Sequence, residues 1–385
     1  MTPAAHVQAA IEVLDRILDG APAERALMSW ARESRYAGAK DRAAVRDHVF
    51  EALRRRNSFA WLGGARTGRG LMIGAARSAH SDLDQVFSGI AYGPPELTQA
   101  ERHLNADLAD APLPVRYDLP DWLLPHVETN AGELNAELLE ALRHRAPLDL
   151  RVNHLKSDVE TARSALAEDG IETDPVEGVS TALRVVTGAR KVSRARAFLD
   201  GLVEIQDASS QAAVLAAEPS VGASVLDYCA GGGGKALALT ALTGAPVMVH
   251  DSETARMRDI PVRAARAGAV CPLWDGQGAF DMVFVDAPCS GSGTWRRIPD
   301  AKWRLTQARL VELVALQAQV LRAASAYVGR RGRLVYATCS VLGCENAEQV
   351  QDFLVEMPGW VLSKTRRFDP NTAGDGFFVA ILERE

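Results

Sequence analysis

The chain has 385 residues, of which 47% are hydrophobic and 24% are charged, and its formal net charge is −6. This length exceeds one ordinary domain, and the composition is that of a soluble globular protein, which excludes wholesale disorder. No stretch approaches the roughly 18–20 apolar residues of a membrane span, and the first residues lack the basic and apolar regions of a signal peptide. We therefore expect a cytosolic protein of two or three domains with no membrane partner.

The first part of the chain, residues 1–140, is predicted to be an all-α bundle. Ile11, Leu14 and Leu18 recur at helical spacing, and the same spacing relates Val45 to Val49. Several arginines gather around the third predicted helix, where they either grip a phosphate backbone or form a solvated helix face; the sequence leaves both interpretations open. These arginines are Arg42, Arg46, Arg54, Arg55 and Arg56.

Two α/β domains are predicted to follow. Residues 141–200 are expected to form a small α/β linker domain, because strand patterns at 148–152 and 182–186 flank a helical pattern at 158–167. From residue 201 to residue 385 strands and helices alternate, which is typical of a Rossmann-like, doubly wound parallel sheet. The strands expected in this third domain are Ser224–Tyr228, Val247–Asp251, Ala269–Trp274, Asp281–Asp286, Arg333–Ala337 and Gly376–Leu382.

A glycine-rich loop joins the first of these strands to a helix. Its residues are Cys229, Ala230, Gly231, Gly232, Gly233, Gly234 and Lys235. Glycines let the backbone approach a ligand closely and point helix-terminal N–H groups at negative charge. A phosphate-binding P-loop is excluded, because Cys229 stands at its first glycine position and Ala236 at its hydroxyl position. A dinucleotide-binding loop stays only a fallback, because the last glycine spacing is not met.

S-adenosylmethionine is the third ligand that this loop would suit. Asp251 ends the next strand and lies 24 positions after Asp227, close to the roughly 20-residue offset of a ribose-binding acid in related sheets. Asp275 ends the third predicted strand, where it would meet the adenine. Taken singly, each aspartate is explained equally well as a helix cap.

The five cysteines all lie beyond residue 225, and none forms a Cys-x-x-Cys pair. We therefore expect no disulfide framework and no metal site. Cys271 and Cys344 are predicted to be small core residues. Cys289 and Cys339 instead follow strand ends, in Asp286-Ala-Pro-Cys-Ser-Gly and Ala-Thr-Cys-Ser, so both thiols are expected to face the ligand crevice beside the glycine loop.

Two thiols in one crevice suit the methylation of carbon 5 of cytosine. That carbon is a poor nucleophile until a thiolate adds to carbon 6 and pushes electrons toward carbon 5. Nearby positive charge would favour the thiolate, and Lys235 and Arg296 are candidate sources. Asp286 could hold the amidine edge of the base and share a proton with it. A second thiol could assist the final expulsion of the first.

These motifs resemble the Sun (NOP/Sun) family of RNA cytosine-5 methyltransferases over about residues 140–385. The resemblance rests on the glycine loop, the two cysteine motifs, Glu345-Asn346 and Asp375-Gly-Phe-Phe. The N-terminal helices also resemble the NusB-type RNA-binding domain of bacterial ribosomal RNA members. The chain departs from the usual Ala-Pro-Gly-Gly-Lys loop at Gly232, which could loosen cofactor affinity, and from a common second acid at Ala347.

The resemblance implies an enzyme that transfers a methyl group from S-adenosylmethionine to carbon 5 of a cytosine, in 16S ribosomal RNA. It implies Cys339 as nucleophile, Cys289 as the residue that aids product release, and Asp286 as an acid that serves catalysis and the cofactor site. The glycine loop, Asp251 and Asp275 would contact the cofactor. We expect a monomer that binds RNA.

The residues from Arg296 to Arg333 carry a net charge of +7, with nine basic residues against two acidic ones. We expect this stretch to line the RNA path. The RNA-binding residues predicted in it are Arg296, Arg297, Lys302 and Arg304.

Two other functions stay open. A DNA cytosine-5 methyltransferase would use the thiol of its Pro-Cys pair, here Cys289, as the nucleophile. An RNA-binding assembly factor with a vestigial methyltransferase fold would not bind the cofactor, and the departure at Gly232 keeps this alternative open.

Overall fold

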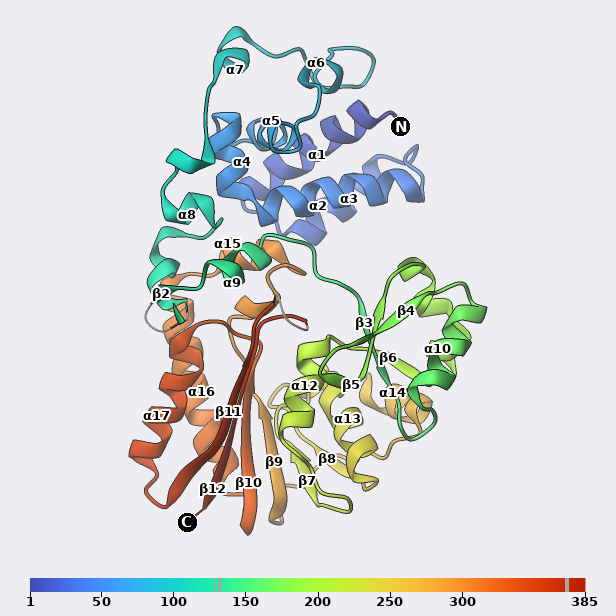
Figure 1. Cartoon of the computed structure of the whole chain (residues 1–385), viewed down its shortest axis with the longest axis vertical. Coiled ribbons are helices and arrows are strands. Elements are labelled where there is room, and N and C mark those ends of the chain that lie inside the picture. The colour runs from blue at the N-terminus through green and yellow to red at the C-terminus, as the bar shows by residue number, and fades with distance from the viewer. Residues whose placement is uncertain (128, 131–132, 371–373, 385) are drawn as a thin grey trace. The chain divides into compact units, whose positions relative to one another are not determined.

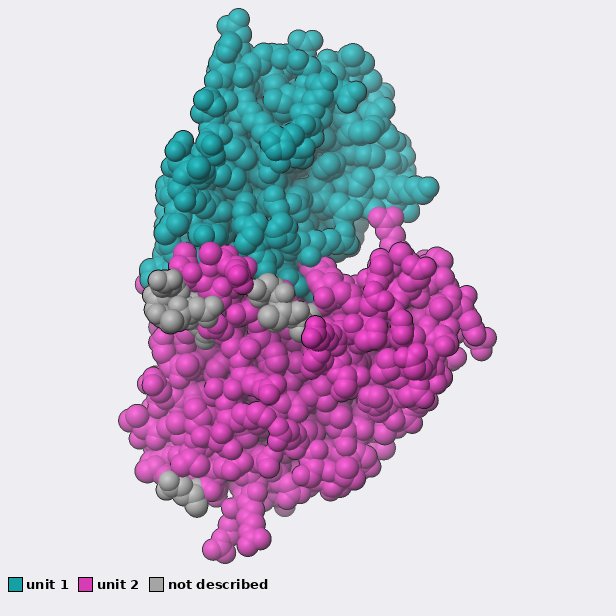
Figure 2. All heavy atoms as spheres, viewed as in Figure 1, with its two compact units in different colours: residues 1–125, 139–145, 295–305 teal, residues 126–138, 146–294, 306–385 magenta. Residues whose placement is uncertain are grey.

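The computed structural model describes residues 1–127, 129–130, 133–370 and 374–384. They divide into two compact units, drawn in teal and magenta in Figure 2. Unit 1 contains Met1–Pro125, Leu139–Arg145 and Trp295–Leu305, and unit 2 contains His126–Leu138, Ala146–Thr294 and Thr306–Glu385. The helical unit therefore includes two segments from later in the chain than the N-terminal domain predicted from sequence.

Unit 1 is helical, as predicted (Figure 1). Its longer helices are α1 (Pro3–Leu18), α2 (Ala23–Glu33), α3 (Ala39–Arg54), α4 (Arg56–Gly63) and α5 (Gly68–Ser78). Its shorter ones are α6 (Leu83–Val86), α7 (Gln99–His103), α8 (Leu113–Arg116), α15 (Pro299–Arg304) and the 3-10 helix η1 (Leu108–Asp110). Ile11, Leu14, Val45 and Val49 are buried in one apolar core, so the helical spacing in the sequence is confirmed.

A four-stranded antiparallel sheet in unit 2 corresponds to the predicted linker domain. Its order is β4-β5-β3-β6, with β3 (Asp149–Val152), β4 (Thr173–Val176), β5 (Val179–Val185) and β6 (Val203–Ile205). Helix α10 (Val159–Glu168) buries Ala162 and Leu166 in the same core as Leu150 of β3. The 3-10 helix η3 (Ala189–Arg194) and helix α11 (Arg196–Leu199) lead from β5 to β6.

The larger sheet of unit 2 has six strands in the order β11-β12-β10-β9-β7-β8. Its strands are β7 (Val225–Asp227), β8 (Val247–Val249), β9 (Phe280–Asp286), β10 (Val328–Thr338), β11 (Trp360–Phe368) and β12 (Phe377–Arg384). The four strands β8, β7, β9 and β10 are parallel, whereas β12 and β11 close the sheet in antiparallel fashion. Because the chain moves outward from β7 to β8 and then returns to β9, the strand order reverses between β7 and β9.

Helices cover both faces of this sheet because its central strands are apolar on both sides. Met282 and Phe284 of β9 pack in one core with α12 (Ala208–Ala216) and α13 (Gly234–Thr243). Val283 and Val285 point to the other face, in a core with α16 (Gln307–Ser325) and α17 (Ala347–Glu356). This alternation confirms the predicted doubly wound α/β fold.

One predicted strand, Ala269–Trp274, is wrong. The segment follows α14 (Ile260–Ala267) along β8, yet it forms only an isolated bridge between Val249 and Leu273. Pro272 lies in its middle and has no N–H group to donate, so a regular ladder cannot continue through it.

The remaining elements are short. They are β1 (Thr129–Asn130), β2 (Glu133–Leu134), α9 (Ala136–Ala141), η2 (Asp121–His126), η4 (Thr254–Met257), η5 (Ser292–Thr294) and η6 (Gly343–Glu345). Among the residues that the structure describes, no helix has the length and apolar character needed to traverse a lipid bilayer.

Candidate active site

The predicted site residues gather at the carboxyl ends of the parallel strands. Asp227 ends β7 and Asp286 ends β9, on the two sides of the point where the strand order reverses. Cys289 follows β9 by three residues, and Cys339 directly follows β10. In sheets of this kind the ligand crevice lies at this edge. The structure therefore brings together the two motifs that the sequence singled out.

The thiols of Cys289 and Cys339 lie 3.4 Å apart, sulfur to sulfur. The backbone fixes this separation, because the N–H of Gly293 donates to the carbonyl of Cys339 at 3.0 Å. The hydrogen bond to Cys339, together with burial, raises the pKa of Cys289 well above the usual thiol value. Cys289 therefore stays a protonated thiol that can donate to its neighbour.

Lys235 and Asp286 form an ion pair beside these thiols, with Nζ of Lys235 2.6 Å from the carboxylate. The ammonium also lies over the ring of Phe377, 4.9 Å from its centre. Burial disfavours the charged lysine, but Asp286 outweighs burial and raises the pKa of Lys235. The site thus holds a permanent positive charge next to a carboxylate and two thiols, as general acid–base chemistry on a polar ring would require.

The glycine loop is shaped by its own backbone and by Asp251. Gly231 and Gly233 have φ values of +50° and +81°, which side-chain-bearing residues rarely adopt. Asp251 is buried and accepts hydrogen bonds from the N–H groups of Gly231 and Glu253, both at 3.0 Å. Asp251 therefore closes the loop against the end of β8, at the position where the sequence predicts a ribose-binding acid.

Two arginines from outside the loop hold its carbonyl groups. Arg151 of β3 is buried and donates to the carbonyl of Gly234 at 2.7 Å. Arg263 of α14 donates to the carbonyl of Gly232. Burial lowers the pKa of Arg151 to about 10, which is still high enough for a full charge at neutral pH. The sequence offered no signal for these contacts, since Arg151 and Gly234 lie 83 positions apart.

Asp227 ends β7, just before the glycine loop. Its side chain is fully buried, and neither carboxylate oxygen has a hydrogen-bond partner of normal geometry among the described residues. Burial, and next the charge of Asp286, raises the pKa of Asp227 to about 7. A buried carboxylate is costly unless donors lie near it, and the backbone N–H groups of Cys229 and Ala236 oppose this rise in the pKa of Asp227. From the sequence alone, Asp227 was only the position from which Asp251 was counted.

The other predicted positions vary in exposure. Cys229 and Ala230 begin the loop, and burial together with Asp227 raises the pKa of the Cys229 thiol, which makes it unreactive. Asp275 is exposed on the loop after the isolated bridge and accepts from the N–H of Gln277 at 3.0 Å. All five cysteines are free, and Cys271 and Cys344 are half-buried. No metal-binding group of His, Cys, Asp or Glu occurs in the described part of the chain.

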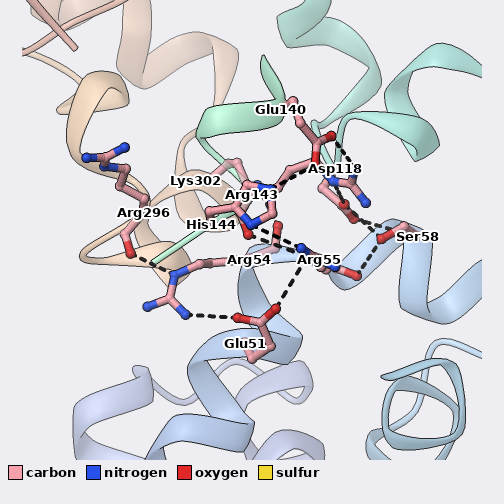
Figure 3. Close-up of polar contacts among 10 residues, drawn as sticks. All are labelled: Glu51, Arg54, Arg55, Ser58, Asp118, Glu140, Arg143, His144, Arg296 and Lys302. Atoms are coloured by element: carbon pink, nitrogen blue, oxygen red, sulfur yellow. Dashed lines mark hydrogen bonds and ion pairs between the residues drawn. The ribbon is translucent and has the colours of Figure 1, made fainter. Parts of the chain in front are cut away.

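The basic residues predicted to bind RNA belong to unit 1, and two of them are buried. Lys302 is 1% exposed, and its ammonium donates to the carbonyl of Arg54 at 3.1 Å. Arg296 is also buried, and its carbonyl accepts from Arg54 at 2.7 Å, as Figure 3 shows. Arg304 keeps a side chain that is 64% exposed, and Arg297 is half-buried. Burial assigns Arg296 and Lys302 to packing inside the helical unit, whereas Arg304 is exposed beside Asp300.

The expectation that the whole +7 stretch forms one RNA path is wrong. Arg330 and Arg331 are exposed near the start of β10, whereas Cys339 follows its end. Arg333 lies six residues before Cys339, which at about 3.3 Å per strand residue is roughly 20 Å, and Arg330 and Arg331 lie in the irregular stretch beyond Arg333. They lie at the opposite edge of the sheet from the candidate site.

Comparison with known proteins identifies the family. A model described as 16S rRNA methyltransferase RsmB/F matches residues 213–383, and a model described as the RsmF/B-like ferredoxin-like domain matches residues 119–192. Ribosomal RNA small subunit methyltransferase B of Klebsiella pneumoniae subsp. pneumoniae is 32% identical over 389 residues, which cover 89% of this chain and 90% of that protein. The chain belongs to the RsmB/F methyltransferase family.

Another relative shares this similarity, and two solved structures share the fold. Ribosomal RNA small subunit methyltransferase B of Serratia proteamaculans is 34% identical over 286 residues, 69% of this chain and 66% of that protein. The crystal structure of PH0851 has a TM-score of 0.73 at 23% identity and covers 100% of this chain and 99% of that one. NSun6 from Pyrococcus horikoshii, solved with SFG, has a TM-score of 0.60 at 18% identity over 69% of this chain and 98% of that one. The two structures establish the fold.

As an RsmB/F family member the chain is a methyltransferase, and its cofactor is S-adenosylmethionine. The residues present fit that cofactor, since the glycine turn and the buried carboxylates of Asp251 and Asp227 line the same strand ends. The comparisons establish the enzyme class, while the role of each residue rests on the geometry.

Proposed function

We propose that the protein is an RNA (cytosine-5)-methyltransferase that acts on 16S ribosomal RNA through a covalent bond between Cys339 and carbon 6 of the base. The names of the relatives support the ribosomal substrate. The observation that carries the proposal is the pair of thiols 3.4 Å apart, beside an ion pair of Lys235 and Asp286. Most methyltransfers to nitrogen or oxygen need no nucleophilic sulfur, whereas attack from carbon 5 does.

In this mechanism Cys339 attacks carbon 6 as a thiolate, and the electron pair of the carbon 5–carbon 6 double bond moves toward carbon 5. S-adenosylmethionine supplies the electrophilic methyl group. Asp286 holds the amidine edge of the cytosine. As charge builds on the ring, Asp286 and the base share a proton between them. The proton on carbon 5 then leaves to solvent, the double bond re-forms, and the electron pair of the sulfur–carbon bond returns to Cys339.

Cys289 assists the last step in this proposal. Its protonated sulfur lies within hydrogen-bond distance of Cys339, so it stabilises the thiolate that departs from carbon 6. Without this donor the covalent bond would form but would break slowly. Two cysteines would thus divide the work, one for attack and one for release.

The cofactor is proposed to lie along the loop from Cys229 to Lys235. Asp227 would pair with the amino group of its methionine part, Asp251 would meet the ribose and Asp275 the adenine. The sulfonium and the ammonium are both positive, so a buried carboxylate next to the loop is complementary to this ligand.

For RNA binding we propose Arg297, Arg304 and the helical unit, which we interpret as a NusB-type domain. Guanidinium groups that contact phosphates release counterions, so binding would weaken as salt is raised. The cytoplasmic location, the monomeric state and the three domain boundaries stay predictions.

The test compares Cys339→Ala with Cys289→Ala. We expect the Cys339 variant to lose methylation of 16S ribosomal RNA and to form no adduct. We expect the Cys289 variant to accumulate a covalent protein–RNA adduct, visible as a slow band on a denaturing gel. Cys271→Ala serves as a control that changes neither result, because the Cys271 sulfur lies 3.6 Å from the hydroxyl of Thr240 on α13 and not in the thiol pair.

Exchange of the two roles would contradict this proposal and favour the DNA-type mechanism, in which Cys289 attacks. Duplex DNA offered as a methyl acceptor would decide that case. Calorimetry with S-adenosylmethionine addresses the vestigial alternative, because such a protein would not bind the cofactor. Bisulfite sequencing of total RNA, with and without the gene, would locate the modified cytosine.

A further inference from the structure

Glu345 is a buried carboxylate behind the two cysteine loops that the mechanism above does not use. It ends η6, six residues after Cys339, and its relative exposure is 0%. No Lys, Arg or His side chain forms an ion pair with it in the described part of the chain. A buried charge without a cation is expensive unless several donors solvate it. Hydrogen-bond donors must therefore stabilise the charge of Glu345.

The donors come from both cysteine loops. Ser290, next to Cys289, donates its N–H to one oxygen of Glu345 at 2.8 Å and its hydroxyl to the other at 2.5 Å. Ser340, next to Cys339, donates its hydroxyl to the second oxygen at 2.5 Å. One carboxylate thus joins the residue after each thiol, so neither loop can move without breaking a charge-assisted hydrogen bond.

Further contacts fix this carboxylate from outside the loops. Gln317 of α16 donates to Glu345 at 2.9 Å and to the carbonyl of Pro288 at 2.9 Å. The hydroxyls of Ser292 and Ser340 form a hydrogen bond of 2.9 Å. The hydroxyl of Ser292 also accepts a hydrogen bond from the N–H of Val341 at 2.9 Å. The network is buried and connects β9, β10 and α16, so it has the rigidity that a reacting pair of atoms requires.

The titratable groups that face Glu345 all resist a second negative charge. They are Cys289 on its loop, Tyr336 of β10, whose hydroxyl donates to the backbone carbonyl of Glu345, and Cys344 of η6. The pKa of each is raised, by the hydrogen bond to Cys339 for Cys289 and by burial for the other two, and the charge of Glu345 adds to the rise in every case. Lys235, the cation of the site, is paired with Asp286.

We infer that Glu345 is a positioning residue that holds the two cysteine loops at a fixed separation and confines the negative charge of the thiol pair to Cys339. This inference rests on the proposed function. It explains why, of the two thiols, Cys339 attacks while Cys289 stays protonated. The proton of the pair stays on Cys289, whose S–H group donates to Cys339 before attack. When the sulfur–carbon bond breaks, its electron pair returns to Cys339 and the same S–H group stabilises it, so no proton is gained or lost by the pair.

The test replaces Glu345 with Gln, which keeps the size and the acceptor oxygen but removes the charge. Ser290 and Ser340 can turn their hydroxyls to accept from the new amide, so the loops stay in place. Glu348→Gln is the matched control, because Glu348 lies three residues along the chain and is exposed. Both variants are made in the wild type and in a Cys339→Ser background, in which Cys289 is the reacting thiol of the pair.

The first readout is alkylation of Cys289 by iodoacetamide as a function of pH, measured by mass spectrometry of its peptide. Removal of an adjacent negative charge favours the thiolate, so we expect the midpoint to fall by about one pH unit or more in the Glu345 variant. Glu348→Gln should leave it unchanged. A purely structural role for Glu345 predicts no shift, and an unchanged midpoint in a folded Glu345 variant would overturn the inference.

The second readout is catalysis in the wild-type background. We expect Glu345→Gln to lower the methylation rate about tenfold or more while the dissociation constant of S-adenosylmethionine is unchanged. If this variant does not fold, Ser290→Ala and Ser340→Ala replace it, since each removes one hydroxyl that donates to Glu345. Turnover in these two variants equal to that of the wild type would contradict the inference. A wild-type protein that methylates none of the RNAs offered would refute the proposed function, whereas the alkylation result, which needs no RNA, would still decide on Glu345.

Discussion

Lys302→Met is predicted to stabilise the helical unit at acidic pH and to destabilise it at alkaline pH. Lys302 lies on α15 inside unit 1, and Figure 3 shows it among Arg54, Arg143 and Asp118. Burial lowers the pKa of Lys302 to about 7, and the positive charges of Arg143 and Arg54 add to this effect against the opposing pull of Asp118. Methionine has nearly the same volume and no charge to desolvate.

The magnitude follows from the difference between the folded and unfolded pKa. A fall from the usual 10.5 to about 7 means that the unfolded chain binds more protons between these two values. The free energy of unfolding therefore rises with pH across this window, by at most about 5 kcal/mol, and the cost is largest below pH 7. Methionine removes that cost but leaves the carbonyl of Arg54 without its donor, which costs about 1–3 kcal/mol.

The variant should thus be more stable than the wild type by about 2–4 kcal/mol at pH 6 and less stable by about 1–3 kcal/mol near pH 10. Urea unfolding of the full chain, followed by far-UV circular dichroism and by hydrogen exchange of α3 and α15, measures this difference. Lys40→Met is the control, because Lys40 is exposed and should show no change of sign. A difference between Lys302→Met and the wild type that does not vary with pH would refute the reasoning.

Three further outcomes follow from the cofactor loop. In calorimetry, the affinity of the wild type for S-adenosylmethionine should fall as the pH drops below about 7, because the carboxylate of Asp227 becomes protonated. Asp227→Asn should weaken this binding and abolish its pH dependence. Gly233→Ala should lower the melting temperature more than Gly222→Ala does: both glycines have positive φ, but an added Cβ meets Ile260 at 2.9 Å only at position 233. Arg151→Met should raise the cofactor dissociation constant several-fold in calorimetry while leaving the far-UV spectrum unchanged, because it releases a loop carbonyl.

The predictions that succeeded from sequence were those carried by local patterns. Helical spacing of apolar residues such as Leu14 and Val49 marks a buried face directly, and the alternation in β9 marks a strand that is covered on both sides. The cysteine motifs were placed correctly because parallel strands end at one edge of the sheet, which brings Cys289 beside Cys339 although 50 positions separate them.

Other features depend on contacts that no local pattern encodes. The segment Trp295–Leu305 carries charges typical of a surface, yet it belongs to the helical unit and buries Lys302 against the end of α3. Hydropathy favours exposure for such a residue, and only the tertiary contacts with Arg54 and Asp118 reveal the opposite. The same holds for Asp227, which resembles any strand-terminal acid until its complete burial is seen.

The four-glycine loop illustrates how a local departure can be compensated from a distance. Glycine in place of proline at position 232 increases the conformational freedom of the unbound loop, which would reduce cofactor affinity. In the structure Arg263 holds the carbonyl of Gly232, and Arg151 holds that of Gly234. Arg151 comes from β3 of the small antiparallel sheet, so that sheet restrains the loop through a buried charge rather than through the loop's own sequence. The small sheet and the glycine loop are therefore joined by a direct hydrogen bond, which is why the Arg151 variant tests whether the sheet supports the loop.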